Sequence, residues 1–297
     1  MPIYVPWSRL IRFVGEEDGL IHFGDAIAPV NDFDIGAHQN VRSLKAKVIT
    51  GDPFKPDCQV TDKIMNVKRL LGPLTSDTVP AVRCIGGNYE AHLRELGIKP
   101  PRFPCMFPKL PNAVAGYGED IEIPKIAQDD QADYEGELVI VIGKDAKNVA
   151  AKDAYDYIVG YTVANDVSAR KWQWDPELVG THPPPQMSFS KSFDSFCPMG
   201  PCITSAALIP DPHTLQLQTR VNGELRQDSN TSDLIVRIPE IIEFCSQGTT
   251  LQAGSVILTG TPSGVGSTMK PPRWLRPGDA IEITIGPMTL IHGVKYA

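Results

Sequence analysis

The chain has 297 residues, of which 42% are hydrophobic, and a net charge of -7 at pH 7. This length allows one large domain, or a main domain with a small one beside it. The charge comes without a basic cluster, which argues against nucleic acid or an anionic membrane surface as a partner. No apolar run approaches the ~20 residues that a membrane-spanning helix needs.

The remaining composition points to a turn-rich protein of a reducing compartment. The 27 prolines and 25 glycines are spread along the chain, which favours short strands and many turns. The six cysteines show neither CxxC spacing nor a small-domain disulfide framework, so they are expected to be buried thiols. Residues 1–7 lack the basic and apolar regions of a secretory signal, and the expected location is the cytoplasm.

Residues 1–78 are predicted to form a small β-rich domain. Two apolar runs, residues 10–14 and 20–23, flank a turn of glycine and acidic residues, a pattern typical of a β-hairpin. Two short helices are expected to follow it, near residues 38–48 and 61–71.

Residues 79–297 are predicted to form a larger domain with many strands and few helices. The expected strands are residues 137–142, 157–165, 214–221, 255–259 and 280–285. The expected helices are residues 89–96 and 238–246, the second with Pro239 in its first turn. The pair Asn222-Gly223 is a strong signal for a hairpin turn. The fold class that follows is a strand-dominated α+β protein.

Two glutamates mark the start of the most apolar segment, residues 134–143. Because alternate residues of a strand share one face, Glu135 and Glu137 point the same way, and Val139 and Val141 continue that face. Carboxylates beside an apolar interior are costly unless they are paired or bound to a metal, so a divalent cation is the favoured interpretation. The alternative is a strand end that reaches the surface, where both glutamates are hydrated.

A third carboxylate, Asp166, stands where the apolar strand 157–165 is expected to end. Together with Glu135 and Glu137 it would form an all-oxygen site that suits Mg²⁺ or Mn²⁺, with positions left for water or substrate oxygens. The alternative is that Asp166 only caps the following turn or helix, which is the commoner role for such a residue taken alone.

Residues 88–97 have the pattern of a short helix that begins after Asn88 as N-cap and ends at Gly97. His92 lies at the edge of its apolar face, and Glu95, three residues later, can reach the imidazole. Such a pair can orient a general base and stabilise its protonated form. The alternative is a surface pair that stabilises the helix slightly.

Two further segments have features of an anion site. Lys191, between aromatic residues, could donate to a developing enolate or oxyanion, or could simply extend to water. Residues 259–266, TGTPSGVG, follow a short apolar strand, and their small side chains permit close backbone approach to an anionic ligand. They match neither a phosphate loop nor a dinucleotide fingerprint, and a tight structural turn is the alternative.

Five segments, in this order, resemble the fumarylacetoacetate hydrolase family: residues 83–92, 134–138, 165–173, 191–198 and 258–266. Among the branches of the family, residues 166–173 and 191–201 are most similar to the oxaloacetate tautomerases. The resemblance implies a catalytic domain built as a mixed β-sandwich roll, preceded by the small N-terminal β-rich domain. It also implies a homodimer.

The resemblance further implies roles for nine residues. The residues similar to the family's Mg²⁺ ligands are Glu135, Glu137 and Asp166. Those similar to the catalytic residues, an acid–base dyad on a short helix that closes over the site and a lysine beside the substrate, are His92, Glu95 and Lys191. The positions similar to those that contact substrate carboxylate or carbonyl oxygens are Arg170, Gln173 and Thr261.

The expected substrate is therefore a small 2-oxo acid or 1,3-dicarbonyl acid, whose enolate Mg²⁺ or Mn²⁺ would stabilise through two of its oxygens. Keto–enol tautomerisation, decarboxylation and hydrolytic C–C cleavage all share that enolate. Tautomerisation or decarboxylation of oxaloacetate is the leading hypothesis. Hydrolysis of an acylpyruvate or a fumarylacetoacetate-like β-diketo acid is the second, and an inactive relative that binds a metal and an acid is the third.

Two departures from the family pattern bear on the substrate. Asn112 and Ala113 stand where many relatives have serines, so a hydroxyl near the substrate is expected to be missing. The loop 174–190 is longer than expected for the tautomerase branch, which leaves the size of the substrate open.

Overall fold

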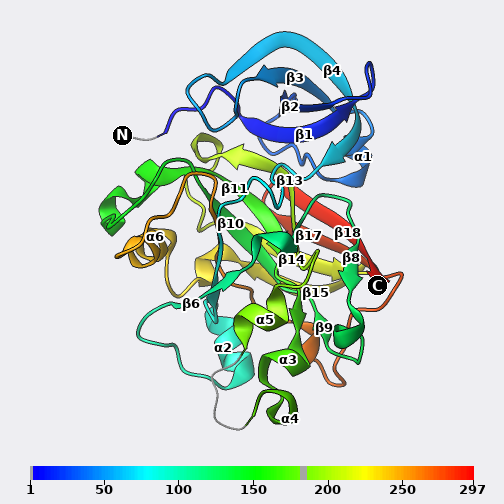
Figure 1. Ribbon diagram of the computed structural model, residues 1–297, viewed down its shortest axis with the longest axis vertical. Coiled ribbons are helices and arrows are strands. Elements are labelled where there is room, and N and C mark those ends of the chain that lie inside the picture. Colours follow the sequence, from blue (N-terminus) through cyan, green and yellow to red (C-terminus); the bar gives the residue numbers. More distant parts are fainter. Residues whose placement is uncertain (1–2, 181–185) are drawn as a thin grey trace.

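A computed structural model describes residues 3–180 and 186–297 of the chain. Residues 181–185, part of the predicted long loop, lie outside the described residues. A small β-barrel lies at one end of the molecule, and the larger body lies below it (Figure 1).

The barrel is formed by β1 (Arg9–Gly15), β2 (Ile21–Ala26), β3 (Lys45–Thr50) and β4 (Gln59–Leu71). β1 pairs with β2 and β4, and β3 also pairs with both, so the four strands close a ring. The predicted hairpin of β1 and β2 is confirmed. β1 also pairs with β13, which joins the barrel to the main sheet. The division of the chain after residue 78 stays a prediction.

The two helices predicted in this region are wrong in different degrees. Residues 61–71 lie within strand β4, and of residues 38–48 only α1 (His38–Val41) is helical. The reason is visible in the burial of β3, where Ala46 and Val48 are buried and Lys45 and Lys47 are exposed. That alternation is typical of a strand with one solvent-exposed face. Strand pairing inside the barrel outweighs the local helix propensity.

The main sheet continues from the barrel in the order β1-β13-β11-β10-β16-β5-β6, with β7 beside β13. Its further strands are β5 (Val82–Gly86), β6 (Cys105–Lys109), β7 (Val114–Ala115), β10 (Gly136–Ile142), β11 (Ile158–Asn165), β13 (Cys197–Ser205) and β16 (Val256–Leu258). Every residue of β10 is buried: Val139 and Val141 pack into one core cluster, and Leu138, Ile140 and Ile142 into another. The predicted two-faced apolar strand is confirmed.

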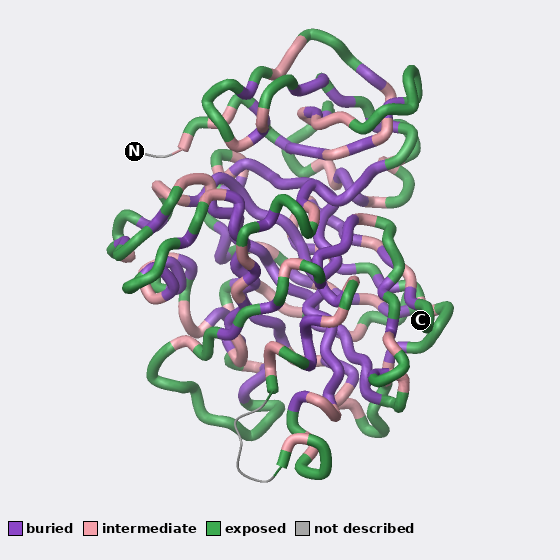
Figure 2. The backbone as a smooth tube through the Cα atoms, viewed as in Figure 1, coloured by how far each residue is buried: buried purple, intermediate pink, exposed green. Residues whose placement is uncertain are grey.

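A second sheet covers one face of the main sheet and shares a core with it. Its order is β15-β14-β17-β18-β8, from β8 (Ile121–Ile123), β14 (Gln216–Val221), β15 (Glu224–Asn230), β17 (Ala280–Ile285) and β18 (Met288–Tyr296). Ile140 of the main sheet packs into the same cluster as Leu217 and Ile283 of the second sheet. Buried residues are concentrated in the central strands of the larger body (Figure 2). Two short strands, β9 (Ala132–Asp133) and β12 (Ser168–Ala169), pair separately.

Helices are short and lie around the sheets. They are α1, α2 (Glu90–Leu96), α3 (Arg170–Trp174), α4 (Pro176–Val179), α5 (Met187–Lys191) and α6 (Ile238–Ser246), with 3-10 turns at Pro111–Ala113, Lys125–Ala127, Ala151–Tyr157, Ala206–Leu208, Thr231–Asp233 and Gly266–Thr268. The predicted helices α2 and α6 are confirmed, as is the hairpin turn at Asn222-Gly223, where both φ angles are positive. Gly97 ends α2 with a φ of 67°, a conformation that favours glycine.

The N-cap of α2 is Tyr89 and not Asn88, so that prediction is wrong. The amide of Asn88 instead donates to the backbone carbonyls of Val236 and Thr259 and accepts from the Val236 N–H. Asn88 thus ties the approach to α2 to two distant loops.

The cysteines and helices agree with most of what the composition indicated. All six cysteines are free thiols; five are buried as expected, but Cys105 is exposed. None of the described helices is both long enough and apolar enough to cross a membrane.

A substitution in strand β10 tests whether the core shared by the two sheets stabilises the protein. Replacing Ile140, which is fully buried between the two sheets, with alanine should lower the free energy of unfolding by about 2–5 kcal/mol, because the cavity cannot close inside a doubly covered strand. Urea unfolding followed by tryptophan fluorescence would measure it. Leu20→Ala, at a side chain 62% exposed, is the control and should change the value by less than about 0.5 kcal/mol.

Candidate active site

The candidate site lies at one edge of the main sheet, where several strand ends meet. β10 runs antiparallel to β11 and β16, with Gly136 opposite Asn165 and Val139 opposite Leu258. The start of β10 therefore lies beside the ends of β11 and β16, and β5, which is parallel to β16, ends there too. This topology brings together polar residues that are far apart in the sequence.

Three carboxylates, the carboxylate trio, form the centre of the site: Glu135 just before β10, Glu137 within it, and Asp166 just after β11. All three residues are buried, and one oxygen of each lies within 4.8 Å of the other two. The alternative of a hydrated strand end is therefore wrong. Asp166 does not cap α3, because the N-cap of that helix is Ala169.

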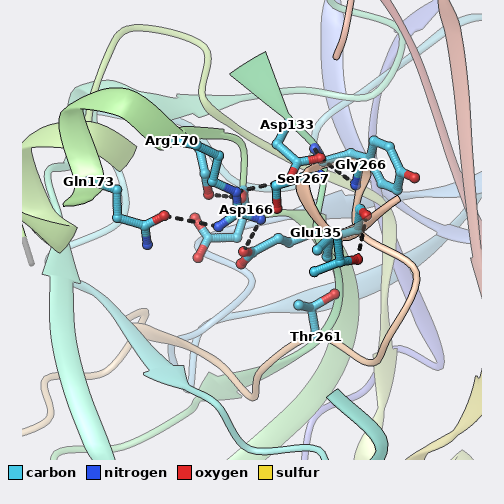
Figure 3. A network of polar contacts seen from close by, with 12 residues as sticks. Asp133, Glu135, Asp166, Arg170, Gln173, Thr261, Gly266 and Ser267 are labelled. Atoms are coloured by element: carbon cyan, nitrogen blue, oxygen red, sulfur yellow. Dashed lines mark hydrogen bonds and ion pairs between the residues drawn. The ribbon is translucent and has the colours of Figure 1, made fainter. Parts of the chain in front are cut away.

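Three cationic side chains are in direct contact with the trio. Lys191 Nζ donates to Glu135 Oε2 at 2.8 Å and to Asp166 Oδ2 at 2.9 Å. Lys109, also fully buried, donates from Nζ to Asp166 Oδ1. Arg170 Nη2 lies 2.7 Å from Glu135 Oε1 (Figure 3). Glu135 and Asp166 are thus well compensated.

Glu137 differs from Glu135 in its protonation. Although burial alone would raise the pKa of Glu135, the charges of Lys191 and Arg170 lower that pKa to about 2. Burial, reinforced by the charges of Asp166 and Glu135, raises the pKa of Glu137 well above its usual value. Glu137 therefore holds its proton to higher pH than an ordinary glutamate, because too little positive charge lies beside it.

The trio fits the divalent cation that the sequence predicted. Three carboxylate oxygens at this separation form an all-oxygen donor set, which hard cations such as Mg²⁺ and Mn²⁺ prefer. The raised pKa of Glu137 marks the place where further positive charge would be most stabilising. Glu135, Glu137 and Asp166 could therefore hold such an ion.

The His92–Glu95 pair, the dyad, is close enough to exchange a proton. His92 Nδ1 lies 2.9 Å from Glu95 Oε2, and His92 is buried, whereas 25% of the Glu95 side chain is exposed. Burial would raise the pKa of Glu95, but hydrogen bonds from His92, Thr268 and Gly264 lower it. The carboxylate form of Glu95 is thereby favoured beside the imidazole.

A cavity of about 300 Å³ connects the dyad to the trio. Of the nine residues singled out in the sequence, eight line it: His92, Glu135, Glu137, Asp166, Arg170, Gln173, Lys191 and Thr261. Glu95 is not among the lining residues and reaches the cavity only through His92. The rest of the wall is mostly apolar: Ile85, Leu93, Leu96, Ile98, Pro101, Phe107, Trp174 and Met187.

Arg170, Gln173 and Thr261 differ in how free they are to contact a ligand. Arg170 Nη2, although close to Glu135, has no well-directed hydrogen bond, so a buried donor remains available there. The Gln173 carbonyl accepts from Arg170 Nη1 at 3.0 Å. The Thr261 hydroxyl donates to the Gly136 carbonyl and accepts from Gln227 Nε2 at 2.8 Å, so one lone pair at most is left for a ligand.

Lys191 is placed by aromatic packing at the end of α5. The rings of Phe189 and Phe193, and of Phe193 and Phe196, pack edge to face with centroids 5.3 and 5.2 Å apart. This ladder anchors the backbone on both sides of the lysine, which is 1% exposed. The alternative that Lys191 extends to water is wrong.

Sequence reasoning missed two buried charged residues at the site, Lys109 and Asp133. Lys109 ends the edge strand β6, and a lone lysine in an apolar strand was the available signal. Asp133 lies two residues before Glu135, so the alternation of carboxylates at Glu135 and Glu137 extends one step further back. Asn112 and Ala113, where a hydroxyl was expected to be missing, do not line the cavity; Asn112 donates to the Ser192 carbonyl.

Comparison with known proteins shows which family the chain belongs to. Residues 81–295 match the family described as fumarylacetoacetate (FAA) hydrolase C-terminal. The chain belongs to the fumarylacetoacetate hydrolase family. It is accordingly an enzyme of that family, and the sequence resemblance is confirmed.

Two curated relatives of the family differ in the reaction that their names state. The oxaloacetate tautomerase YisK of Bacillus subtilis is 46% identical over 207 residues, which cover 69% of this chain and 66% of that protein. The caffeoylpyruvate hydrolase of Neonothopanus nambi is 39% identical over 290 residues, which cover 96% of this chain and 91% of that one.

A solved structure of the family confirms the fold class. The 2-hydroxyhepta-2,4-diene-1,7-dioate isomerase of Mycobacterium marinum superposes with a TM-score of 0.78 at 34% identity, over 97% of this chain and 98% of that one. The strand-dominated α+β architecture with a small N-terminal β-barrel is thus the fold of the family.

The raised pKa of Glu137 predicts how metal binding depends on pH. A metal ligand must be deprotonated, so the affinity for Mn²⁺ should fall as the pH is lowered, and binding should release a proton wherever Glu137 is still protonated. Calorimetric titrations in two buffers of different ionisation enthalpy would measure that release. Glu137→Gln should weaken binding and abolish the release, whereas Glu122→Gln, at an exposed residue, should leave both unchanged. A heat of binding that is the same in both buffers would contradict the prediction.

Proposed function

We propose that this enzyme interconverts the keto and enol forms of a small 2-oxo acid of the oxaloacetate type. The observation that carries the proposal is the arrangement across the cavity, with the dyad on α2 facing the cationic groups around the trio. The dyad is suited to move a proton at carbon, and the cationic groups are suited to stabilise the charge that develops on oxygen. The relative YisK, named an oxaloacetate tautomerase, supports this choice.

The charges at the site favour an anionic substrate once a dication is bound. Among the described residues, four buried carboxylates (the trio and Asp133) face three buried cations: Lys109, Lys191 and Arg170. A divalent ion would turn this excess of negative charge into an excess of positive charge. It would also supply Lewis acidity toward the oxygens of the substrate.

The chain's own residues would divide the work as follows. Arg170, through an Nη2 proton that Glu135 does not use, would bind a carboxylate or carbonyl oxygen, and Gln173 would hold the guanidinium in place. Lys191 would donate to the oxygen that gains charge. In the keto-to-enol direction His92, oriented by Glu95, would take a proton from the substrate carbon while the carbonyl oxygen gains one from water. In the reverse direction His92 would return a proton to carbon, and the enol oxygen would lose its proton to water. Thr261 would accept a hydrogen bond through its remaining lone pair. Mg²⁺ or Mn²⁺ as the ion, a homodimer and a cytoplasmic location stay predictions.

The test of the proposal is the decay of the enol absorbance of oxaloacetate with Mg²⁺ and with a chelator. Faster decay with Mg²⁺ and without pyruvate is the expected result, because tautomerisation leaves the carbon skeleton intact. Pyruvate and carbon dioxide would indicate decarboxylation instead. No change above the uncatalysed rate would contradict the proposal.

A second candidate function is hydrolytic C–C cleavage of an acylpyruvate, in which the dyad would activate water. The apolar outer wall of the cavity, with Leu96, Ile98 and Trp174, favours it, because a dicarboxylate gains nothing from such a wall. The caffeoylpyruvate hydrolase is a relative whose named substrate has an aromatic arm. Release of pyruvate from acylpyruvates, with a kcat/KM that rises with the apolar area of the acyl arm, would favour this function over the first.

His92 is the residue on which either reaction depends. His92→Ala should lower kcat by about 10²–10⁴-fold, the usual contribution of a general acid–base group, and leave the affinity for Mn²⁺ nearly unchanged. His22→Ala removes a matched histidine–carboxylate pair at the surface, with Asp18, and should have wild-type kinetics. Loss of Mn²⁺ binding in His92→Ala would show that the role assigned to this histidine is wrong.

A further inference from the structure

The segment of residues 264–268, the bridge segment, contacts the dyad from outside. Glu95 Oε1 accepts from the backbone N–H of Gly264 at 3.2 Å and from the hydroxyl of Thr268 at 2.7 Å. Glu95 Oε2 is the oxygen bound to His92. Each oxygen of the carboxylate thus has its own partner, one inside the dyad and one in the bridge segment.

The same segment is fastened on its other side to Asp133. The N–H groups of Gly266 and Ser267 donate to Asp133 Oδ1 at 2.7 Å and Oδ2 at 3.1 Å. Asp133 also accepts from Arg170 Nε at 2.8 Å, and Arg170 in turn pairs with Glu135 of the trio (Figure 3). A continuous set of contacts therefore runs from Glu95 to a carboxylate of the trio.

The bridge segment has little freedom to move between these contacts. Tyr134 donates from its hydroxyl to the Gly264 carbonyl at 2.8 Å. A Cβ atom on Gly266 would lie 2.0 Å from the Arg273 carbonyl oxygen and 2.7 Å from Asp133 Oδ1, so the backbone passes too close for any side chain. Packing this tight transmits a displacement instead of absorbing it.

Helix α2 depends on such outside support. It has 7 residues and buries only His92 and Leu93, and a helix of this length is not stable by itself in water. Its remaining polar contacts therefore decide where the dyad sits above the cavity.

We propose that Asp133 and Thr268 are positioning residues, which through the bridge segment fix the dyad above the carboxylate trio. The inference rests on the acid–base role proposed for the dyad. Asp133 holds the segment to the sheet edge, and Thr268 presents its hydroxyl to the oxygen of Glu95 that His92 does not use. Hydrogen bonds to a charged acceptor are the stronger ones, so this contact outweighs that of the same hydroxyl with the Val265 carbonyl.

Thr268→Val tests the proposal, because it removes the hydroxyl and keeps the shape. We expect kcat to fall about ten- to hundred-fold, since a small misplacement of a reacting group is costly, while KM and the affinity for Mn²⁺ stay within about two-fold. Thr268→Ser should restore kcat. Thr214→Val is the matched control: its hydroxyl bonds the backbone carbonyl of Asp211 at the surface, and its loss should not change kcat.

A double variant separates positioning from a general loss of structure. If Thr268 acts through Glu95, adding Thr268→Val to Glu95→Ala should lower kcat no further, because the partner is already gone. A full additional loss in the double variant, a Thr268→Ser protein as impaired as Thr268→Val, or a Thr268→Val protein with wild-type kcat would each overturn the proposal.

Amide hydrogen exchange gives a readout that needs no substrate. Thr268→Val and Asp133→Asn should both speed exchange in α2, and Thr214→Val should not. If the wild-type enzyme turns over none of the 2-oxo acids tested, the proposed function fails. Hydrogen exchange alone then decides whether the bridge segment positions the dyad. Faster exchange in α2 would then support it, and unchanged exchange in both variants would overturn it.

Discussion

The structure depends on a group of like charges held together inside a protein interior. Burying a carboxylate without a compensating charge carries a large free-energy cost. Here three carboxylates each place an oxygen within 4.8 Å of the other two. Lys191 and Lys109 offset that cost from α5 and β6, elements that no local pattern connects. The strand order makes the meeting possible, because the ends of β11, β16 and β5 lie beside the start of β10.

Local sequence patterns predicted those parts of the fold that are determined by residues close together in the sequence. The two faces of β10, the glycine end of α2 and the turn at Asn222-Gly223 each depend on a few neighbouring side chains. The helix expected at residues 61–71 failed for the opposite reason. Its residues form β4 because partners in β1 and β3, far along the chain, supply hydrogen bonds that no local preference reveals.

The site was predictable to the extent that its residues fall in recognisable segments. The two glutamates of the trio were found from carboxylate alternation, Asp166 from the end of a predicted strand, and the dyad from helix spacing. The structure brings all three carboxylates to one cavity with His92. Lys109 and Asp133 were missed because their importance lies in contacts with residues 57 and 37 positions away, Asp166 and Arg170. Asn88 was assigned to a cap by its position alone, whereas its partners lie 148 and 171 residues away.

The cavity is built from two kinds of structure, and this has a consequence for how the family can diversify. Its carboxylate trio lies in or next to paired strands, but Leu96, Trp174 and Met187 of its outer wall belong to helices of seven residues or fewer, the same helices that carry His92, Arg170 and Lys191. Changes in those short elements alter no strand pairing. A lineage can therefore exchange one ligand shape for another by mutating single rim side chains, while the strands that hold the trio are inherited intact.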